Sequence, residues 1–278
     1  MILTNGCSYT AAGENWPDAF AKYGYTFYDN FNKEKNYDIV NIGAGGAGNT
    51  LIRRKTFHAL NGVKYKDDID YAIIQWSTID RWDYPISFMS EDDAPLIKLN
   101  LHNDDWVGKV GYTRNGTSLE GKSKIFYENL YSKYGQLLNT LDDIYYTQLF
   151  LENLGIPYLM FSIANFLTTE ASFDMIKSIG DIKGDLQKQK INKLEIEKLM
   201  NYSEESDSLE IIKKKINWDK FIWSSDFKID NIGDGFTEYL INKGEPFKQT
   251  GNHPDETQHT NFFNDIIYPK FISEINSI

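Results

Sequence analysis

The first half of the chain alternates short apolar segments with segments in which apolar and polar residues are mixed. The apolar segments Ile2–Thr4, Tyr37–Asn41 and Tyr71–Trp76 have the length and composition of strands. The mixed segments between them, Trp16–Tyr23 and Thr50–Leu60, predict helices. Strands that alternate with helices indicate βαβ units and therefore a parallel sheet.

The same alternation resumes after the middle of the chain. A long helical pattern over Ser123–Leu154 is followed by Gly155-Ile156-Pro157, a combination of glycine and proline that stops helices. The apolar run Tyr158–Ser162 then predicts a fourth strand. Near the end, Phe262–Ile275 predicts an apolar helix that packs on the sheet. The pattern as a whole predicts an α/β protein.

Two long stretches interrupt this alternation. The first, from about residue 85 to 122, is polar and rich in turn residues, and the second, from about 167 to 248, mixes charged helical patterns with short aromatic pieces. We expect both to be helical or irregular insertions into a single domain that spans residues 1–278. Because 41% of the 278 residues are hydrophobic, the chain is long enough to form one substantial core.

Charge and cysteine content narrow the class of protein. A formal net charge of −11 argues against a sequence-independent nucleic-acid binder, because contacts to phosphates need clustered Lys and Arg. The single cysteine, Cys7, excludes an internal disulfide. No signal-peptide pattern and no run of about 18 apolar residues is visible, so we expect no membrane span. The compartment stays open, because a cytoplasmic and a phage-associated protein both fit.

Ser8 follows the first predicted strand, at the point where Gly6 allows the chain to turn sharply. An exposed serine acts as a nucleophile when a base lies within hydrogen-bond reach and donors stabilise the oxyanion. We expect His253 to be that base, because the segment Gln249–His259 precedes the last predicted helix and leads to the same edge of the sheet. The alternative is that Ser8 is a turn or N-cap serine and His253 a surface-loop histidine.

A glycine-rich loop, Gly43–Asn49, follows the second predicted strand and admits two interpretations. Its pattern Gly43-x-Gly45-x-x-Gly48 matches the fingerprint of dinucleotide-binding folds, in which a helix amino terminus holds a pyrophosphate. That fingerprint expects an acidic residue at the end of the next strand, whereas the acidic residues here precede that strand. We therefore favour a loop whose amides approach a reacting oxyanion, with dinucleotide binding as the less favoured alternative.

Three motifs together resemble the SGNH (GDSL-like) hydrolases. They are Gly6-Cys7-Ser8 after the first strand, Asn41-x-Gly43-x-x-Gly46 after the second, and His253-Pro254 followed by His259. The resemblance covers about residues 1–80 and 249–278. It implies a flavodoxin-like, three-layer α/β/α fold with a central parallel sheet, and an activity among esterases, lipases, thioesterases and carbohydrate O-deacetylases. It also implies Ser8 as nucleophile, His253 as general base, and the amides of Ser8 and Gly46 as oxyanion-hole donors.

The chain departs from the family pattern at two positions. Where the family has an oxyanion-hole Asn after the third strand, the chain offers Ser77 and Thr78, whose hydroxyls are the expected substitute donors. Where the family has an Asp three residues before the histidine, the chain has Thr250. The acceptor that orients the imidazole is then expected to be Thr250, a backbone carbonyl, Glu245 or Asp255.

These residues predict a serine esterase or acyl hydrolase that works through a Ser8–His253 dyad and an acyl-enzyme, with no cofactor and no metal. The expected substrate is a small acyl ester or an acylated glycan, and carbohydrate O-deacetylation is the most specific prediction. The missing Asn and Asp motivate an alternative, a catalytically degenerate protein that keeps the fold and binds glycans or serves a structural role. The sequence leaves open the oligomeric state and the acyl and alcohol groups.

Overall fold

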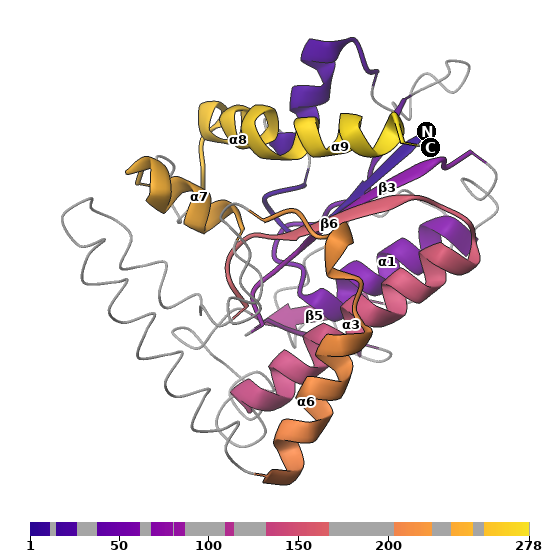
Figure 1. The fold of residues 1–278 in the computed structure, drawn as a ribbon. Coiled ribbons are helices and arrows are strands. Elements are labelled where there is room, and N and C mark those ends of the chain that lie inside the picture. Colours follow the sequence, from indigo (N-terminus) through magenta and orange to yellow (C-terminus); the bar gives the residue numbers. More distant parts are fainter. Residues whose placement is uncertain are drawn as a thin grey trace.

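The structure is a computed structural model of the chain. It describes residues 1–11, 15–26, 38–61, 68–79, 81–86, 109–113, 132–166, 203–223, 235–246 and 253–277. These residues form an α/β protein around a four-stranded parallel sheet (Figure 1). The predicted fold class is confirmed at this level.

The sheet contains β1 (Ile2–Asn5), β2 (Ile39–Asn41), β3 (Tyr71–Trp76) and β6 (Tyr158–Ser162) in the order β2-β1-β3-β6. Ile2 of β1 is in register with Ile39 on one side and with Tyr71 on the other. The strands lie in the four apolar runs that the hydrophobic pattern predicts, although β2 begins at Ile39 and Tyr37 lies outside the described residues. All the residues of β1, β3 and β6 are buried, as expected of a parallel sheet covered on both faces.

Helices lie on both sides of this sheet. In Figure 1, α1 (Asn49–Asn61) and α3 (Lys133–Asn153) run below it, and α8 (Glu256–Phe262) and α9 (Tyr268–Ile275) run above it. The predicted helix over residues 50–60 corresponds to α1 with one more residue at each end. The upper helices are held to the sheet by aromatic side chains, because ring centroids of β3 and α9 lie 5.2 Å apart and those of β6 and α8 lie 5.6 Å apart.

The boundaries of α3 follow from its capping residues. The helix begins after Ser132, whose hydroxyl accepts a hydrogen bond from the amide of Gly135 at 3.1 Å. The part of the predicted helix over 123–131 lies outside the described residues. At the other end Gly155 has φ +69°, and its amide donates to the carbonyl of Glu152 at 3.0 Å. The predicted helix stop is therefore confirmed.

The segment Trp16–Tyr23, predicted as a helix, is the 3-10 helix η1. Pro17 stands at its start, and the buried ring of Phe20 packs against Phe263 at 4.6 Å and Phe271 at 5.4 Å. The predicted apolar helix over 262–275 is also present, with a π-helical stretch, η5 (Phe263–Ile267), between α8 and α9. Pro269 follows that stretch and has no amide to donate, which accounts for the interrupted α-helical bonding.

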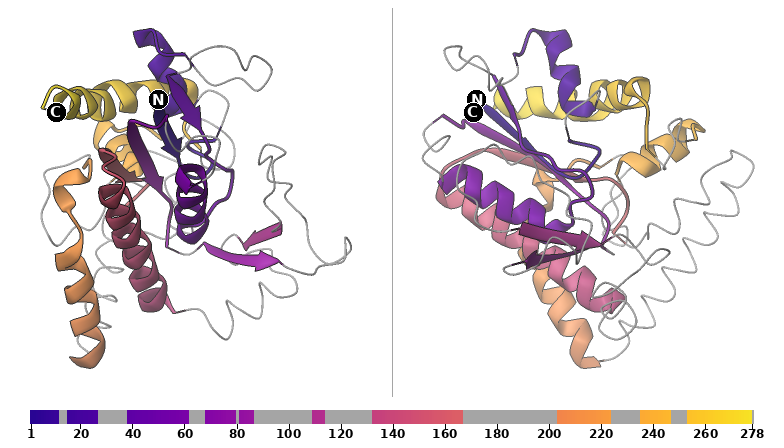
Figure 2. Two further views of the ribbon diagram at one scale, coloured as in Figure 1. Left: turned by 90° about the vertical axis from the view of Figure 1, so that its right-hand side faces the viewer. Right: turned by 180° about the vertical axis from the view of Figure 1, so that it is seen from behind.

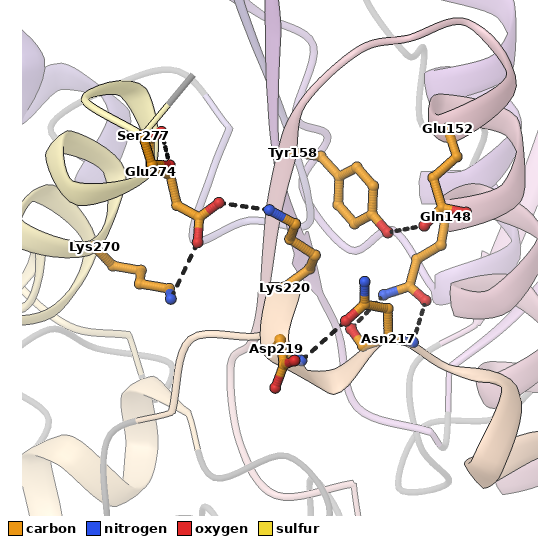
Figure 3. A network of polar contacts seen from close by, with 9 residues as sticks. All are labelled: Gln148, Glu152, Tyr158, Asn217, Asp219, Lys220, Lys270, Glu274 and Ser277. Atoms are coloured by element: carbon orange, nitrogen blue, oxygen red, sulfur yellow. Dashed lines mark hydrogen bonds and ion pairs between the residues drawn. The ribbon is translucent and has the colours of Figure 1, made fainter.

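The edge of the sheet beside β6 is covered by the segment that follows α6 (Ser203–Lys215). Within it the amide of Ile222 donates to the carbonyl of Met160 at 2.7 Å. The segment is fastened on both sides by the network in Figure 3: Gln148 of α3 exchanges two hydrogen bonds with the backbone of Asn217, and Lys220 pairs with Glu274 of α9 at 2.5 Å. Residues 216–223 therefore connect the helices above the sheet with those below it.

The remaining elements lie in or directly beside the two stretches expected to be insertions. β4 (Trp82–Ile86) and β5 (Lys109–Thr113) form an antiparallel pair outside the main sheet, as Figure 2 shows. α6 and α7 (Phe236–Lys243) belong to the second stretch. The single-domain organisation with these insertions stays a prediction. Among the helices in the described ranges, none has the length and apolar character needed to cross a membrane.

Candidate active site

The turn after β1 presents Ser8. The amides of Thr10 and Ala11 both donate to the carbonyl of Cys7 at 2.9 Å, which closes the chain into a tight turn. Gly6 permits this approach, because a Cβ there would lie 2.8 Å from Oε1 of Gln75. The side chain of Ser8 is only partly buried, whereas Cys7 and Thr10 on either side of it are fully buried. The turn therefore exposes the one hydroxyl that was predicted to react.

A buried polar network fixes this turn from below. The hydroxyl of Thr10 bonds to Oε1 of Gln75 on β3 and accepts a bond from the indole of Trp16 at 3.0 Å. Nε2 of Gln75 donates to Sγ of Cys7 at 3.6 Å. The side chain of Asn5 donates to the carbonyl of Ile52 at 2.7 Å and so ties the end of β1 to α1. Pairing of this kind inside a protein rigidifies the backbone that it supports.

The structure brings Ser8 and His253 together. Ser8 Oγ lies 2.8 Å from Nε2 of His253 across 245 residues of sequence, a normal hydrogen-bond distance. The imidazole is partly buried and packs against the ring of Tyr9, with centroids 5.1 Å apart. The chain reaches this place because α8 begins directly afterwards, with Asp255 as its N-cap. The nucleophile and the base of a predicted dyad are thus in contact.

A second imidazole, that of His259, also packs against Tyr9 but is more deeply buried than that of His253. It is 2% exposed and packs edge-to-face against Tyr9 at 5.8 Å and Phe236 at 4.9 Å. Within the described part of the chain its Nδ1 has no hydrogen-bond partner. Burial, with a smaller contribution from nearby His253, lowers its pKa to about 3, so His259 is neutral at neutral pH.

The glycine loop between β2 and α1 packs against the Ser8 turn. The side chain of Asn41 donates to the carbonyl of Thr10 at 2.6 Å, and the amide of Ala44 donates to the carbonyl of Gly6 at 2.9 Å. Gly46 has φ +76°, a conformation that favours glycine. No hydrogen bond between described residues uses the backbone amide of Ser8 or of Gly46. These two predicted oxyanion donors thus have no partner among the described residues.

Ser77 and Thr78 follow β3 directly, at the same edge of the sheet. Both side chains are buried, with 0% and 1% exposure, and their hydroxyls have no hydrogen-bond partner in the described structure. The backbone of Ser77 is held by Asn49, which accepts from its amide at 2.7 Å and donates to its carbonyl at 3.2 Å. Buried hydroxyls without partners are rare, and a bound ligand is one explanation for them.

The predicted acceptors for the imidazole fall into three cases. Thr250 lies outside the described residues. Asp255 caps α8, because its Oδ1 accepts a hydrogen bond from the amide of Gln258 at 2.8 Å. Glu245, just after α7, accepts from the side chain of the same Gln258 at 3.4 Å. The structure thus gives Asp255 a capping role, and the identity of the group that orients His253 stays a prediction.

The structure also places two residues near this site that the sequence analysis did not single out. Tyr9 packs on His253, and its only sequence signal is its position beside Ser8. Asp83 of β4 is fully buried and accepts hydrogen bonds from the amides of Gly48 and Leu51 at 3.0 and 2.8 Å. Nothing local in the sequence marks Asp83, because the loop that it contacts lies about 35 residues away.

Comparisons with known proteins identify no relative of this chain. No protein-family model, curated protein or solved structure matches this chain. Across the described ranges, no group of three or more His, Cys, Asp or Glu side chains is arranged to hold a metal ion. The functional assignment therefore depends on the geometry of the site.

Proposed function

We propose that this chain is a serine hydrolase that cleaves an ester through a Ser8–His253 dyad. The observation that carries the proposal is the 2.8 Å contact between Ser8 Oγ and His253 Nε2, in a turn at the carboxyl edge of a parallel sheet. Ligands of open α/β sheets bind at that edge. A serine and a histidine in this relation are the minimal pair for nucleophilic catalysis.

The proposed reaction proceeds in two steps. His253 Nε2 takes the proton of Ser8 as Oγ attacks the ester carbonyl carbon, and the resulting oxyanion accepts hydrogen bonds from the amides of Ser8 and Gly46. The alcohol leaves with the proton from His253, and Ser8 keeps the acyl group. A water molecule then attacks this acyl-enzyme, again with His253 as base, and releases the carboxylic acid.

The hydroxyls of Ser77 and Thr78 are proposed as the third donor to the oxyanion. They stand after β3, where the SGNH hydrolases carry an Asn, and they are buried and unpartnered among the described residues. A single donor of this kind is worth about 100-fold or more in rate. This assignment accounts for two buried hydroxyls that have no partner among the described residues.

The finer fold assignment is also part of the proposal. The strand order β2-β1-β3-β6 is that of the first four strands of a flavodoxin-like sheet, and Phe221 forms a parallel bridge with Met160 where a fifth strand would lie. We infer a three-layer α/β/α arrangement of the SGNH type. The resemblance to that group of hydrolases makes small acyl esters, and O-acylated glycans in particular, the substrates to test first.

A fluorophosphonate probe tests this function directly. Wild type is expected to be labelled on Ser8, and Ser8→Ala and His253→Ala should lose at least about 99% of the labelling rate. Ser277→Ala is the matched control, because this exposed serine bonds only to the carbonyl of Glu274 within the described residues. Equal labelling of wild type and Ser8→Ala would refute the proposal.

The same variants separate the hydrolase from a catalytically degenerate glycan-binding protein. A hydrolase releases acetate from an O-acetylated oligosaccharide in the wild type and not in Ser8→Ala. A degenerate binder gives no acetate with either protein, while calorimetry shows equal affinity of both for the deacetylated oligosaccharide.

A further inference from the structure

The glycine loop that carries Gly46 is held at its far end by Arg81, directly before β4, and by Asp83 within it. The carboxylate of Asp83 accepts hydrogen bonds from the amides of Gly48 and Leu51 at 3.0 and 2.8 Å. The guanidinium of Arg81 donates to the carbonyl of Ala47 at 3.2 Å. Both side chains are buried, at 7% and 8% exposure. One short segment, residues 81–83, thus holds the carbonyl of Ala47 and the amides of Gly48 and Leu51.

The contact leaves no room for a side chain at position 48. A Cβ at Gly48 would lie 2.6 Å from Oδ2 of Asp83 and 3.0 Å from the carbonyl oxygen of Arg81. The near end of the loop is held to the Ser8 turn by Asn41 and Ala44. Gly46 lies between the two fastenings, so its amide direction depends on both. A shift of about 1 Å in such a donor is enough to cost a large factor in rate.

We propose that Asp83, assisted by Arg81, is a positioning residue that aims the Gly46 amide at the oxyanion of the Ser8 reaction. The inference rests on the proposed hydrolase function. Asp83 does not touch the reacting atoms; it acts through the loop. It also caps the amino terminus of α1, where a carboxylate is favoured by the unpaired amides and the helix dipole.

The position of Asp83 in this cluster makes the loop sensitive to pH. Burial, with a smaller contribution from nearby Asp143, raises the pKa of Asp83 to about 6, although the amides of Leu51 and Gly48 and the charge of Arg81 oppose the shift. Asp143 is itself paired with Arg53 at 3.0 Å and accepts a bond from Thr50 at 2.9 Å. Protonation removes the charge of Asp83 and places a proton on one of its two acceptor oxygens, which weakens its hydrogen bonds to the loop.

Asp83→Asn tests the proposal, with Asp143→Asn as the matched control. Both acids are buried and burial raises the pKa of each to about 6, but the contacts of Asp143 within the described structure go to Arg53 and Thr50 and not to the loop. With p-nitrophenyl acetate we expect Asp83→Asn to lower kcat about 10-fold with less than about a twofold change in KM. Asp143→Asn should leave both constants within about twofold of wild type.

The pH profile gives a readout that a purely structural role would not move. The ratio of kcat in the wild type to kcat in Asp83→Asn should fall from about 10 above pH 7 to about 1 well below pH 6, because protonated Asp83 carries no more charge than Asn. A purely structural role would leave this ratio independent of pH. Asp143→Asn should show the same fall relative to Asp83→Asn, displaced to lower pH because Asp143 contributes to the raised pKa of Asp83.

Gly48→Ala and amide hydrogen exchange cover the case in which Asp83→Asn folds poorly. Gly48→Ala should reproduce the loss in kcat, and both variants should exchange faster than wild type over residues 42–51. Normal kcat in a folded Asp83→Asn or Gly48→Ala, while wild-type Ser8 is labelled, would overturn the positioning role alone. No Ser8 labelling and no turnover in the wild type would overturn the proposed function and, with it, this inference.

Discussion

The Ser8 turn and the end of β3 meet at the same edge of the sheet, yet they differ in whether their buried hydroxyls have hydrogen-bond partners among the described residues. In the turn, the hydroxyl of Thr10 has two partners, Gln75 and Trp16. At the end of β3, the hydroxyls of Ser77 and Thr78 have none among the described residues. Because an unpaired buried hydroxyl costs stability, the difference separates a part that is rigid from a part whose hydroxyls we propose as donors to a ligand.

Thr10→Val gives the largest expected effect on the paired side. Valine has nearly the same shape, but it leaves Oε1 of Gln75 and the indole N–H of Trp16 without their partner. We expect the free energy of unfolding to fall by about 2–4 kcal/mol, as measured by urea denaturation. A loss below about 0.5 kcal/mol would show that the network is not what holds the turn.

Thr78→Val makes the same change on the unpaired side and should do the reverse. Removing a hydroxyl without a partner should leave the free energy of unfolding unchanged or raise it by up to about 1 kcal/mol. If Thr78 is the third donor, kcat falls about 100-fold. Ser77→Ala is measured beside it, and the variant with the larger loss identifies the donor. Full activity of both variants would remove the hydroxyls from the mechanism.

Tyr9 connects the Ser8 turn with the base, because it follows Ser8 and packs on the imidazole of His253. Tyr9→Leu removes the ring that supports the base, so kcat and the rate of Ser8 labelling should both fall about 10-fold. Tyr9→Phe keeps the ring and should retain most of the activity. An equal loss in the two variants would assign the effect to the hydroxyl instead.

The remaining prediction concerns His259, whose Nδ1 has no hydrogen-bond partner among the described residues. Its lowered pKa, about 3 against 6.5 for the free side chain, means that the unfolded chain binds a proton that the folded chain does not. The free energy of unfolding is therefore unaffected by His259 above about pH 6.5 and decreases as the pH falls from there towards about 3. Asp83 and Asp143 act oppositely, because their raised pKa makes the folded chain gain stability as the pH falls below about 6.

His259→Phe separates these opposing contributions. As the pH falls from about 6 to 4, the free energy of unfolding of the variant should rise relative to that of the wild type by about 1.4 kcal/mol per pH unit. Urea denaturation at several pH values measures the difference. Parallel curves for the two proteins would show that His259 is protonated as readily in the folded chain as in the unfolded chain.

The parts of the fold that depend on local pattern could be predicted from the sequence. The four apolar runs became the four strands, and Ser8 and His253, recognised by their motifs, are in contact. Trp16–Tyr23 turned out to be a 3-10 helix, a distinction that hydrophobic pattern does not make. Asp83 could not be found, because its role arises from β4 packing against α1 and no residue near it in sequence signals that contact.

Trapping the acyl-enzyme tests the central claim, that Ser8 is the nucleophile activated by His253, most directly. Protein mixed with p-nitrophenyl acetate and quenched in acid is analysed by intact mass and peptide mapping. We predict one acetyl group on Ser8 in the wild type and none in Ser8→Ala. Release of nitrophenol with the acetyl group on another residue, or at an equal rate from Ser8→Ala, would contradict it.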